Sequence, residues 1–200
     1  MFALYLITDD AAPAVLLDKV ADALAEAPAG QVCVQLRVKQ RSARDQYELG
    51  RKLLALCRGR GALLLVNDRV DVALSLGADG VHLPEEGLPL TATRQLLGAK
   101  AWIGVSCHDA LGLERAATDG ANFATLSPVF VSPGKGEPLG LARFEAMTRA
   151  ARLPVYALGG IRHAQTPQLR AAGATGVAVI SAVLQAASPR TAVREFLSCF

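Results

Sequence analysis

The pentapeptide Gly77-Ala-Asp-Gly-Val81 recurs in altered form as Gly120-Ala-Asn-Phe-Ala124 and as Gly173-Ala-Thr-Gly-Val177. Each copy follows an amphipathic stretch and leads into a short apolar run, so its first residue falls where a helix ends. Glycine is the residue that most readily ends a helix in the left-handed conformation. The recurrence therefore predicts a repeated unit in which a helix turns directly into a strand.

Outward from these copies, short runs rich in β-branched residues alternate with longer amphipathic stretches. Strands are predicted over residues 2–8, 32–36, 62–66, 80–83, 102–106, 123–126, 155–158 and 177–180. Helices are predicted over residues 14–25, 43–58, 70–76, 91–97, 110–118, 141–150, 167–171 and 190–197. Eight strand–helix units predict an α/β fold, a single (β/α)8 TIM barrel domain over residues 1–200. A doubly wound open sheet is the rival, but it needs a glycine-rich turn where this chain has Thr8-Asp9-Asp10.

Composition narrows the function classes. The chain has 200 residues, of which 52% are hydrophobic and 20% charged, which excludes a disordered chain. Its 21 Lys and Arg are dispersed among 18 Asp and Glu, so no nucleic-acid partner is expected and a small phosphorylated substrate fits the mild positive charge better. No apolar run is long enough to span a bilayer, so we expect no membrane partner and a cytoplasmic location. Four scattered cysteines predict neither a zinc site nor a disulfide framework.

In a TIM barrel the active site lies at the carboxyl ends of the strands, so the polar residues that follow each predicted strand are the candidates. Two cations and an amide follow the second strand, an amide and a carboxylate follow the third, and a hydroxyl and a histidine follow the fifth. A further hydroxyl and a lysine lie in the Gly/Pro-rich loop 127–140 after the sixth strand, which has the composition of a mobile anion-binding loop. In chain order these residues are Gln35, Arg37, Lys39, Asn67, Asp68, Ser106, His108, Ser132 and Lys135.

The last two strands predict a phosphate site. Gly159 and Gly160 follow the seventh strand, and Ile180 and Ser181 follow the eighth. Loops at these two points of a barrel commonly bind phosphate, since glycine lets backbone N–H groups approach the anion. A tight turn and a helix cap are the alternative interpretation of either motif taken alone.

Single residues leave alternatives open. Asp68 either holds a divalent cation or caps the helix over 70–76. His108 either moves a proton or begins a helix. We expect His82 to be a buried structural residue and assign no role to His163. Cys107 and His108 are neighbours on a strand and face opposite sides, which argues against a nucleophile pair.

The ordered motifs resemble those of the thiamine phosphate synthase/TenI family over residues 4 to about 184. They read LYLITD, QLRVK, VNDRVDVAL, GADGVHL, IGVSCH, SPVFVSPGK, PLGL, YALGGI and GVAVISA. The resemblance implies a thiamine-biosynthesis enzyme, and it leaves two activities open because the family contains a synthase and a thiazole tautomerase.

If the chain is similar to the synthase branch, it joins hydroxymethylpyrimidine diphosphate to thiazole phosphate with release of diphosphate, and Mg²⁺ is its cofactor. The resemblance then implies that Asp68 binds the metal and that Gly160, Ile180 and Ser181 hold the thiazole phosphate. It implies that the pyrimidine diphosphate is surrounded by Gln35, Arg37, Lys39, Asn67, Ser132 and Lys135.

Departures from the synthase pattern lie mostly in the segment His82-Leu-Pro-Glu-Glu-Gly-Leu-Pro89. Gly87 occupies the position where the synthases carry a second metal carboxylate, and the sequence does not decide whether Glu85 or Glu86 replaces it. These departures slightly favour the tautomerase, which aromatises a thiazole carboxylate phosphate by a proton shift and requires no metal. The catalytic candidates are then His108, with Ser106 and Lys135 beside it. The alternative is the synthase, and a minor alternative is a non-catalytic phosphate-binding or regulatory homologue. A homodimer formed through the outer helices is also possible for a barrel of this family.

Overall fold

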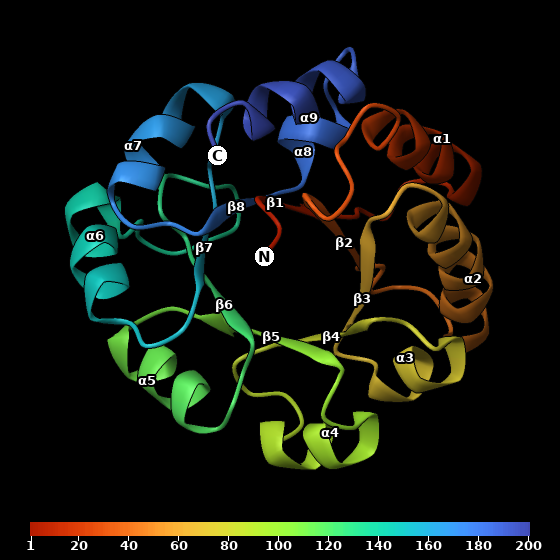
Figure 1. The fold of residues 1–200 in the computed structure, drawn as a ribbon, viewed down its shortest axis with the longest axis horizontal. Helices are drawn as coiled ribbons and strands as arrows, with labels where there is room; N and C mark the ends of the chain where they lie inside the picture. The colour runs from red at the N-terminus through yellow and green to blue at the C-terminus, as the bar shows by residue number, and fades with distance from the viewer.

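A computed structural model describes residues 1–200 and shows a closed barrel of eight parallel strands that pair in sequence order (Figure 1). The pairing of Leu4 in the first strand with Val177 in the last closes the ring. The strands are β1 (Leu4–Ile7), β2 (Val32–Leu36), β3 (Leu63–Asn67), β4 (Gly80–Leu83), β5 (Trp102–Cys107), β6 (Phe123–Leu126), β7 (Val155–Leu158) and β8 (Gly176–Val179).

Helices follow the strands and form an outer ring around them (Figure 1). They are α1 (Pro13–Ala23), α2 (Ala43–Gly59), α3 (Val70–Leu76), α4 (Leu90–Leu97), α5 (Ala110–Thr118), α6 (Gly140–Ala150), α7 (Thr166–Ala171), α8 (Ser181–Leu184) and α9 (Pro189–Leu197), with a 3-10 turn η1 (His163–Gln165) before α7. The predicted TIM barrel is confirmed, and the open sheet is excluded. None of these helices is both long and apolar enough to cross a membrane.

The observed strand and helix boundaries lie within two residues of the predicted ones, with one strand shortened at both ends and one helix added. The first strand is shorter than predicted, because its pairing covers only Leu4–Ile7 on the side of β2 and only residues 4–6 on the side of β8. The helix α8 was not predicted, since a single turn of four residues is too short to show a helical period.

The recurring pentapeptides work as the sequence suggested. Gly77, Gly120 and Gly173 all have positive φ angles, of 62°, 87° and 92°, one or two residues after the ends of α3, α5 and α7. The third residue then ties the turn to the preceding strand in two of the copies. Asp79 accepts a hydrogen bond from the backbone N–H of Leu64 (2.8 Å), and Asn122 accepts one from that of Ile103 (2.8 Å). The motif thus ends a helix and sets the start of the next strand.

The largest core cluster packs outward-facing strand residues against the helices and contains 37 buried residues. A separate cluster fills the barrel itself and includes Phe2, Tyr5, Phe123 and Tyr156. Phe2 stacks on Tyr156 with ring centroids 4.7 Å apart, and Phe123 meets Tyr156 edge-on at 5.2 Å. These aromatic rings plug the amino-terminal half of the barrel, so a ligand has room only at the carboxyl ends of the strands.

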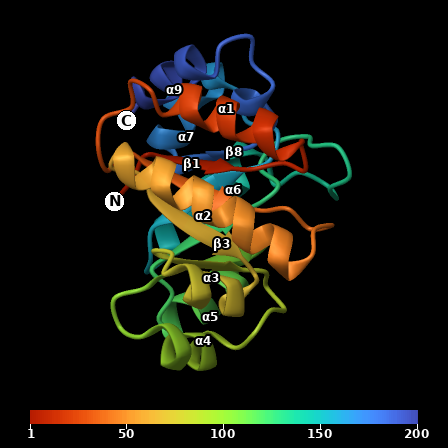
Figure 2. The ribbon, with the colours of Figure 1, turned by 90° about the vertical axis from the view of Figure 1, so that its right-hand side faces the viewer.

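Both chain termini lie on the side of the barrel opposite to those carboxyl ends. In Figure 2 the loop between β6 and α6 projects from one side of the molecule, and the N- and C-termini lie on the other. The site described below therefore opens on the face that carries neither terminus.

Candidate active site

A cavity of about 290 Å³ lies on the barrel axis at the carboxyl ends of the strands. We call it the axial cavity. It is lined by Ile7, Gln35, Arg37, Lys39, Asn67, Asp68, His82, Pro84, Glu85, Ser106, His108, Ser127, Ser132, Lys135, Leu158, Gly159 and Ile180. Fourteen of these seventeen residues are not hydrophobic, as expected for a site that binds charged groups.

Three cations face the axial cavity and none of them forms an ion pair with a carboxylate of the chain. Arg37 and Lys39 follow β2, and Lys135 comes from the loop between β6 and α6. The ion pairs of this protein all involve arginines at other positions, namely Arg51, Arg69, Arg115, Arg149, Arg190 and Arg194. Unpaired cations from two loops of one mouth provide the charge that a phosphate or diphosphate needs.

The position of Arg37 is fixed by a residue that the sequence interpretation did not single out. The buried side chain of Thr8, at the end of β1, accepts a hydrogen bond from the backbone N–H of Arg37 (2.8 Å). Nearby, the side-chain amide of Gln35 donates to the hydroxyl of Tyr5 (2.8 Å) inside the barrel. Both contacts join β1 to β2, so the first strand orients the residues that the second strand presents.

Asp68 follows β3 in the left-handed backbone region, with a φ of 62°, and it is the one non-glycine residue of the chain there. The alternative interpretation of Asp68 as a helix cap is wrong, because Arg69 is the N-cap residue of α3 and no side chain caps that helix. Short polar residues such as Asp tolerate this conformation better than most. The turn therefore leaves the Asp68 carboxylate facing the cavity instead of the helix.

His108 lies just beyond β5 with its ring held by the loop that follows β6. Its Nδ1 is 2.7 Å from the carbonyl oxygen of Ser127. A carbonyl can only accept, so Nδ1 carries the proton and Nε2 of the neutral ring is the free acceptor. The geometry leaves one nitrogen able to take up a proton at the cavity.

His82 is buried, as predicted, with 3% of its surface exposed, yet it also lines the axial cavity. Its Nε2 lies 3.1 Å from Ser106 Oγ and 3.4 Å from Thr125 Oγ1. Its Nδ1 faces the backbone of Gly104 and has no hydrogen-bond partner. Burial, followed by the nearby Arg37, lowers the pKa of His82 from 6.5 to about 3. His82 is therefore neutral at pH 7 and orients Ser106 without adding charge.

Cys107 points away from the cavity into the outer core. Burial raises the pKa of its thiol from 9.0 to about 12, so almost no thiolate is present at neutral pH. All four cysteines are free. His163 is exposed and lies against Phe196, away from the axial cavity.

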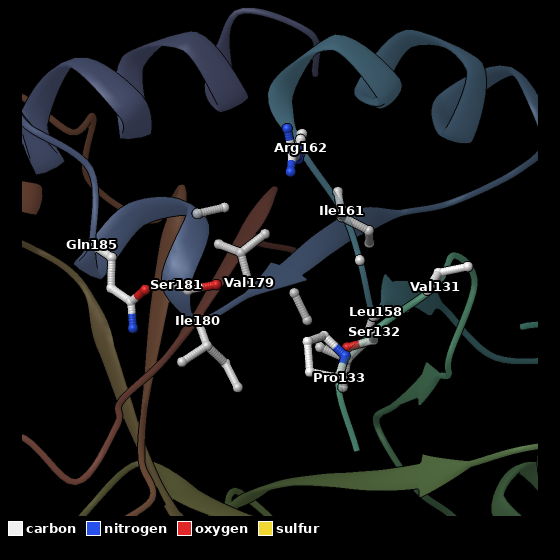
Figure 3. A pocket seen from close by; sticks show the side chains of 14 residues that line it. Val131, Ser132, Pro133, Leu158, Ile161, Arg162, Val179, Ile180, Ser181 and Gln185 are labelled. Atoms are coloured by element: carbon white, nitrogen blue, oxygen red, sulfur yellow. The ribbon is translucent and has the colours of Figure 1, made fainter. Parts of the chain in front are cut away.

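A second cavity, of about 470 Å³, adjoins the axial cavity at the ends of β7 and β8, and the two share Ser132, Leu158, Gly159 and Ile180. We call it the glycine cavity. Figure 3 shows the loop with Val131, Ser132 and Pro133 facing Ile180 and Ser181 across it. Its remaining lining residues are Gly160, Ile161, Arg162, Ala178, Val179, Ala182 and Gln185.

The backbone of the glycine cavity suits an anion. Gly159 and Gly160 have positive φ angles of 99° and 67°, and the N–H groups of Gly160 and Ile161 donate to no backbone carbonyl. Ser181 is the first residue of α8, where helix N–H groups have no intrahelical acceptor. Several free N–H groups therefore converge at this end of the site, which is how proteins commonly bind phosphate.

All thirteen candidate site residues line one or both of these cavities. The structure therefore brings them together, while the role of each stays a prediction. The sequence interpretation assigned no role to the supporting residues Thr8, Tyr5 and Ser127, which act through hydrogen bonds between elements distant in the chain. Only the positions of Thr8 and Ser127, directly after β1 and β6, could have indicated these two residues.

Comparison with known proteins identifies the family. The model of the family described as thiamine monophosphate synthase matches residues 4–183. A protein of Geobacter sulfurreducens, provisionally named a thiamine-phosphate synthase, is 48% identical over 98% of this chain and 93% of its own. The thiamine-phosphate synthase of Roseiflexus castenholzii is 42% identical over 95% of this chain and 84% of its own.

A solved structure gives the same result. The thiamine phosphate pyrophosphorylase from Pyrococcus furiosus superposes with a TM-score of 0.87 at 32% identity, covering 99% of this chain and 95% of that one. The names of these relatives denote a transferase and agree with the synthase alternative better than with the tautomerase. From the matched family model and the identity to these relatives, the chain belongs to the thiamine monophosphate synthase family.

Proposed function

We propose that the protein is a thiamine-phosphate synthase, which joins hydroxymethylpyrimidine diphosphate to thiazole phosphate and releases diphosphate. The observation that carries this proposal is the pair of adjoining anion sites: three unpaired cations in the axial cavity and a cluster of free N–H groups in the glycine cavity. A tautomerase acts on one phosphorylated substrate and needs only the second of these. A synthase needs both.

Each cavity has a task in this reaction. Arg37, Lys39 and Lys135 bind the diphosphate and stabilise the negative charge that it develops as it departs. Gly160 and Ser181 hold the phosphate of the thiazole, which orients that ring toward the axial cavity. Because Gly159 and Ile180 line both cavities, the two substrates meet there.

The side chains of the axial cavity also fit a magnesium ion, provided that the diphosphate is present. Asp68 and Glu85 are its two carboxylates, and no group of three His, Cys, Asp or Glu side chains that could hold a metal occurs in the chain. Mg²⁺ is usually held by one or two carboxylates, with phosphate oxygens and water as the other ligands. Asp68 would hold it, with Asn67 beside it. When bound, Mg²⁺ neutralises charge on the leaving diphosphate.

The test is product formation by the purified protein given both substrates and Mg²⁺, with thiamine phosphate measured by liquid chromatography. We expect Mg²⁺-dependent product, and we expect Arg37→Met to reduce kcat/KM by at least about tenfold, the equivalent of one charge-assisted hydrogen bond. A protein that binds both substrates and forms no product would refute the proposal.

The tautomerase is the second candidate, because the Ser127 carbonyl leaves His108 Nε2 free to accept a proton. It is tested by supplying the thiazole carboxylate phosphate without metal and following aromatisation of the ring. His108→Asn should then abolish turnover and leave phosphate binding intact. If aromatisation is fast and no thiamine phosphate forms, this candidate replaces the first. The cytoplasmic location and the homodimer remain predictions.

A further inference from the structure

Glu85 stands in the wall between the axial cavity and a third cavity on the outside of the barrel. This outer cavity, of about 450 Å³, lies between the segment after β4 and the helix α5. It is lined by Leu83, Pro84, Glu85, Glu86, Gly87, Leu88, Pro89, Leu90, Val105, Ser106, Cys107, Gly112, Arg115, Ala116 and Asp119. Pro84, Glu85 and Ser106 line both this cavity and the axial one, whereas Glu86 and Gly87 line only the outer one.

The carboxylate of Glu85 is held toward α5 in this structure. Its Oε1 is 2.9 Å from Nη2 of Arg115, in an ion pair whose side chains are 27% and 66% exposed. Gly112 makes room for it, because a Cβ at that position would lie 3.0 Å from Glu85 Oε1. Exposed ion pairs of this kind are weak, so the carboxylate can change partner at little cost.

A divalent cation bound in the axial cavity would be a stronger partner for the Glu85 carboxylate than Arg115 is. Asp68 is the only other carboxylate that lines this cavity, against three cations, so a divalent cation there meets one acidic side chain unless Glu85 turns inward. Glu86 cannot supply a second carboxylate to the axial cavity, since it lines only the outer cavity, and Gly87 has no side chain. A doubly charged ion attracts a carboxylate more strongly than one solvated guanidinium does.

We propose that Glu85 is the second carboxylate for the divalent cation of the cation–diphosphate complex, and that Arg115 holds it on the outer side of the wall while the site is empty. This inference rests on the proposed function. It assigns different tasks to two adjacent acidic residues, Glu85 and Glu86, that the sequence alone could not tell apart.

The test measures binding without turnover. Inorganic diphosphate, alone or as its Mn²⁺ complex, is titrated by calorimetry into the wild-type protein and into Glu85→Gln, with Glu86→Gln as the matched control. We expect Glu85→Gln to weaken binding of the Mn²⁺ complex about tenfold, which is the usual scale for losing a group that supports a metal. It should not weaken binding of metal-free diphosphate, because removing a negative charge cannot repel an anion. Glu86→Gln should change neither affinity.

A second variant tests the ion pair between Arg115 and Glu85. Arg115→Met removes the competitor for the carboxylate and should tighten binding of the Mn²⁺ complex several-fold, whereas Arg149→Met, which removes an equally exposed arginine paired with Glu145, should not. Unchanged affinity of Glu85→Gln for the Mn²⁺ complex, or a loss confined to Glu86→Gln, would overturn the inference. Thiamine phosphate formation, measured on the same preparations, separates this inference from the proposed synthase activity. If the wild type forms product but Glu85→Gln binds the Mn²⁺ complex as tightly as the wild type, only this inference fails. If Glu85→Gln weakens binding of the Mn²⁺ complex as expected but no product forms, only the synthase proposal fails.

Discussion

At the scale of single residues, Gly160 joins backbone conformation to ligand binding. Its φ of 67° is one that side chains disfavour, and a Cβ there would collide with the carbonyl oxygen of Val131 in the loop that carries Ser132 and Lys135. We expect Gly160→Ala to lower the free energy of unfolding by about 1–3 kcal/mol and to raise KM for the thiazole phosphate. Thermal unfolding and steady-state kinetics measure the two effects. Gly136→Ala, in the same loop with open space around it, should change neither.

His82 predicts a dependence of stability on pH. Its pKa is about 3 in the folded protein, because of burial and then Arg37, against 6.5 for a free histidine, so the unfolded chain binds a proton first as pH falls. Its contribution is complete above pH 6.5 and is lost as the pH falls toward 3. Between pH 6.5 and 4.5 the free energy of unfolding should drop by about 2–3 kcal/mol on this account.

Urea unfolding of the wild type and of His82→Gln at the two pH values checks this. The variant has no imidazole to protonate, so its stability should fall less than that of the wild type by the same amount. Equal losses in the two proteins would show that His82 does not govern the acid sensitivity.

At the scale of elements, the turn between α5 and β6 depends on one amide. Asn122 Oδ1 accepts from the N–H of Ile103 (2.8 Å) and from the guanidinium of Arg94 (2.8 Å), so one atom joins α4, β5 and β6. We expect Asn122→Ala to destabilise the protein by about 1–3 kcal/mol, because a buried donor loses its acceptor. The melting temperature should fall by roughly 2–4 °C per kcal/mol for a chain of this size. Asn122→Asp keeps the acceptor and should remain close to the wild type; if both variants melt alike, the hydrogen bonds are not the cause.

The elements also show what the sequence could reveal. Four strands coincide with their predicted ranges, because apolar runs and the glycine or proline that precedes each of them are local signals. The gathering of all thirteen site residues at one mouth followed from the rule that strand ends converge in a barrel. The sequence could not predict contacts between elements that lie far apart in the chain. No periodic pattern in the sequence indicates the hydrogen bond from Gln35 to Tyr5 or the one between His108 and Ser127. The same is true of the ion pair between Glu85 and Arg115.

At the scale of the whole molecule, unpaired positive charge is concentrated at one cavity. The formal net charge is only +3, yet three unpaired cations face a single cavity. Inorganic diphosphate with Mg²⁺ should therefore stabilise the fold, by about 2.7 kcal/mol at a hundred times its dissociation constant. That corresponds to a rise in melting temperature of roughly 5–10 °C.

A thermal-shift titration measures this rise. Lys39→Met should reduce it markedly, while Lys100→Met, which removes an exposed lysine that does not line the cavity, should retain it. A shift that is the same in both variants would mean that the diphosphate stabilises the protein at some other surface.

The position of the two termini has a practical consequence. Both lie on the face opposite to the mouth (Figure 2), and the aromatic plug of Phe2, Phe123 and Tyr156 closes the barrel on that side. A tether attached at either end should leave the entrance unobstructed and turned toward the solution. Immobilised on a bead or electrode through its first or last residue, the protein would present every copy of its site in the same outward orientation.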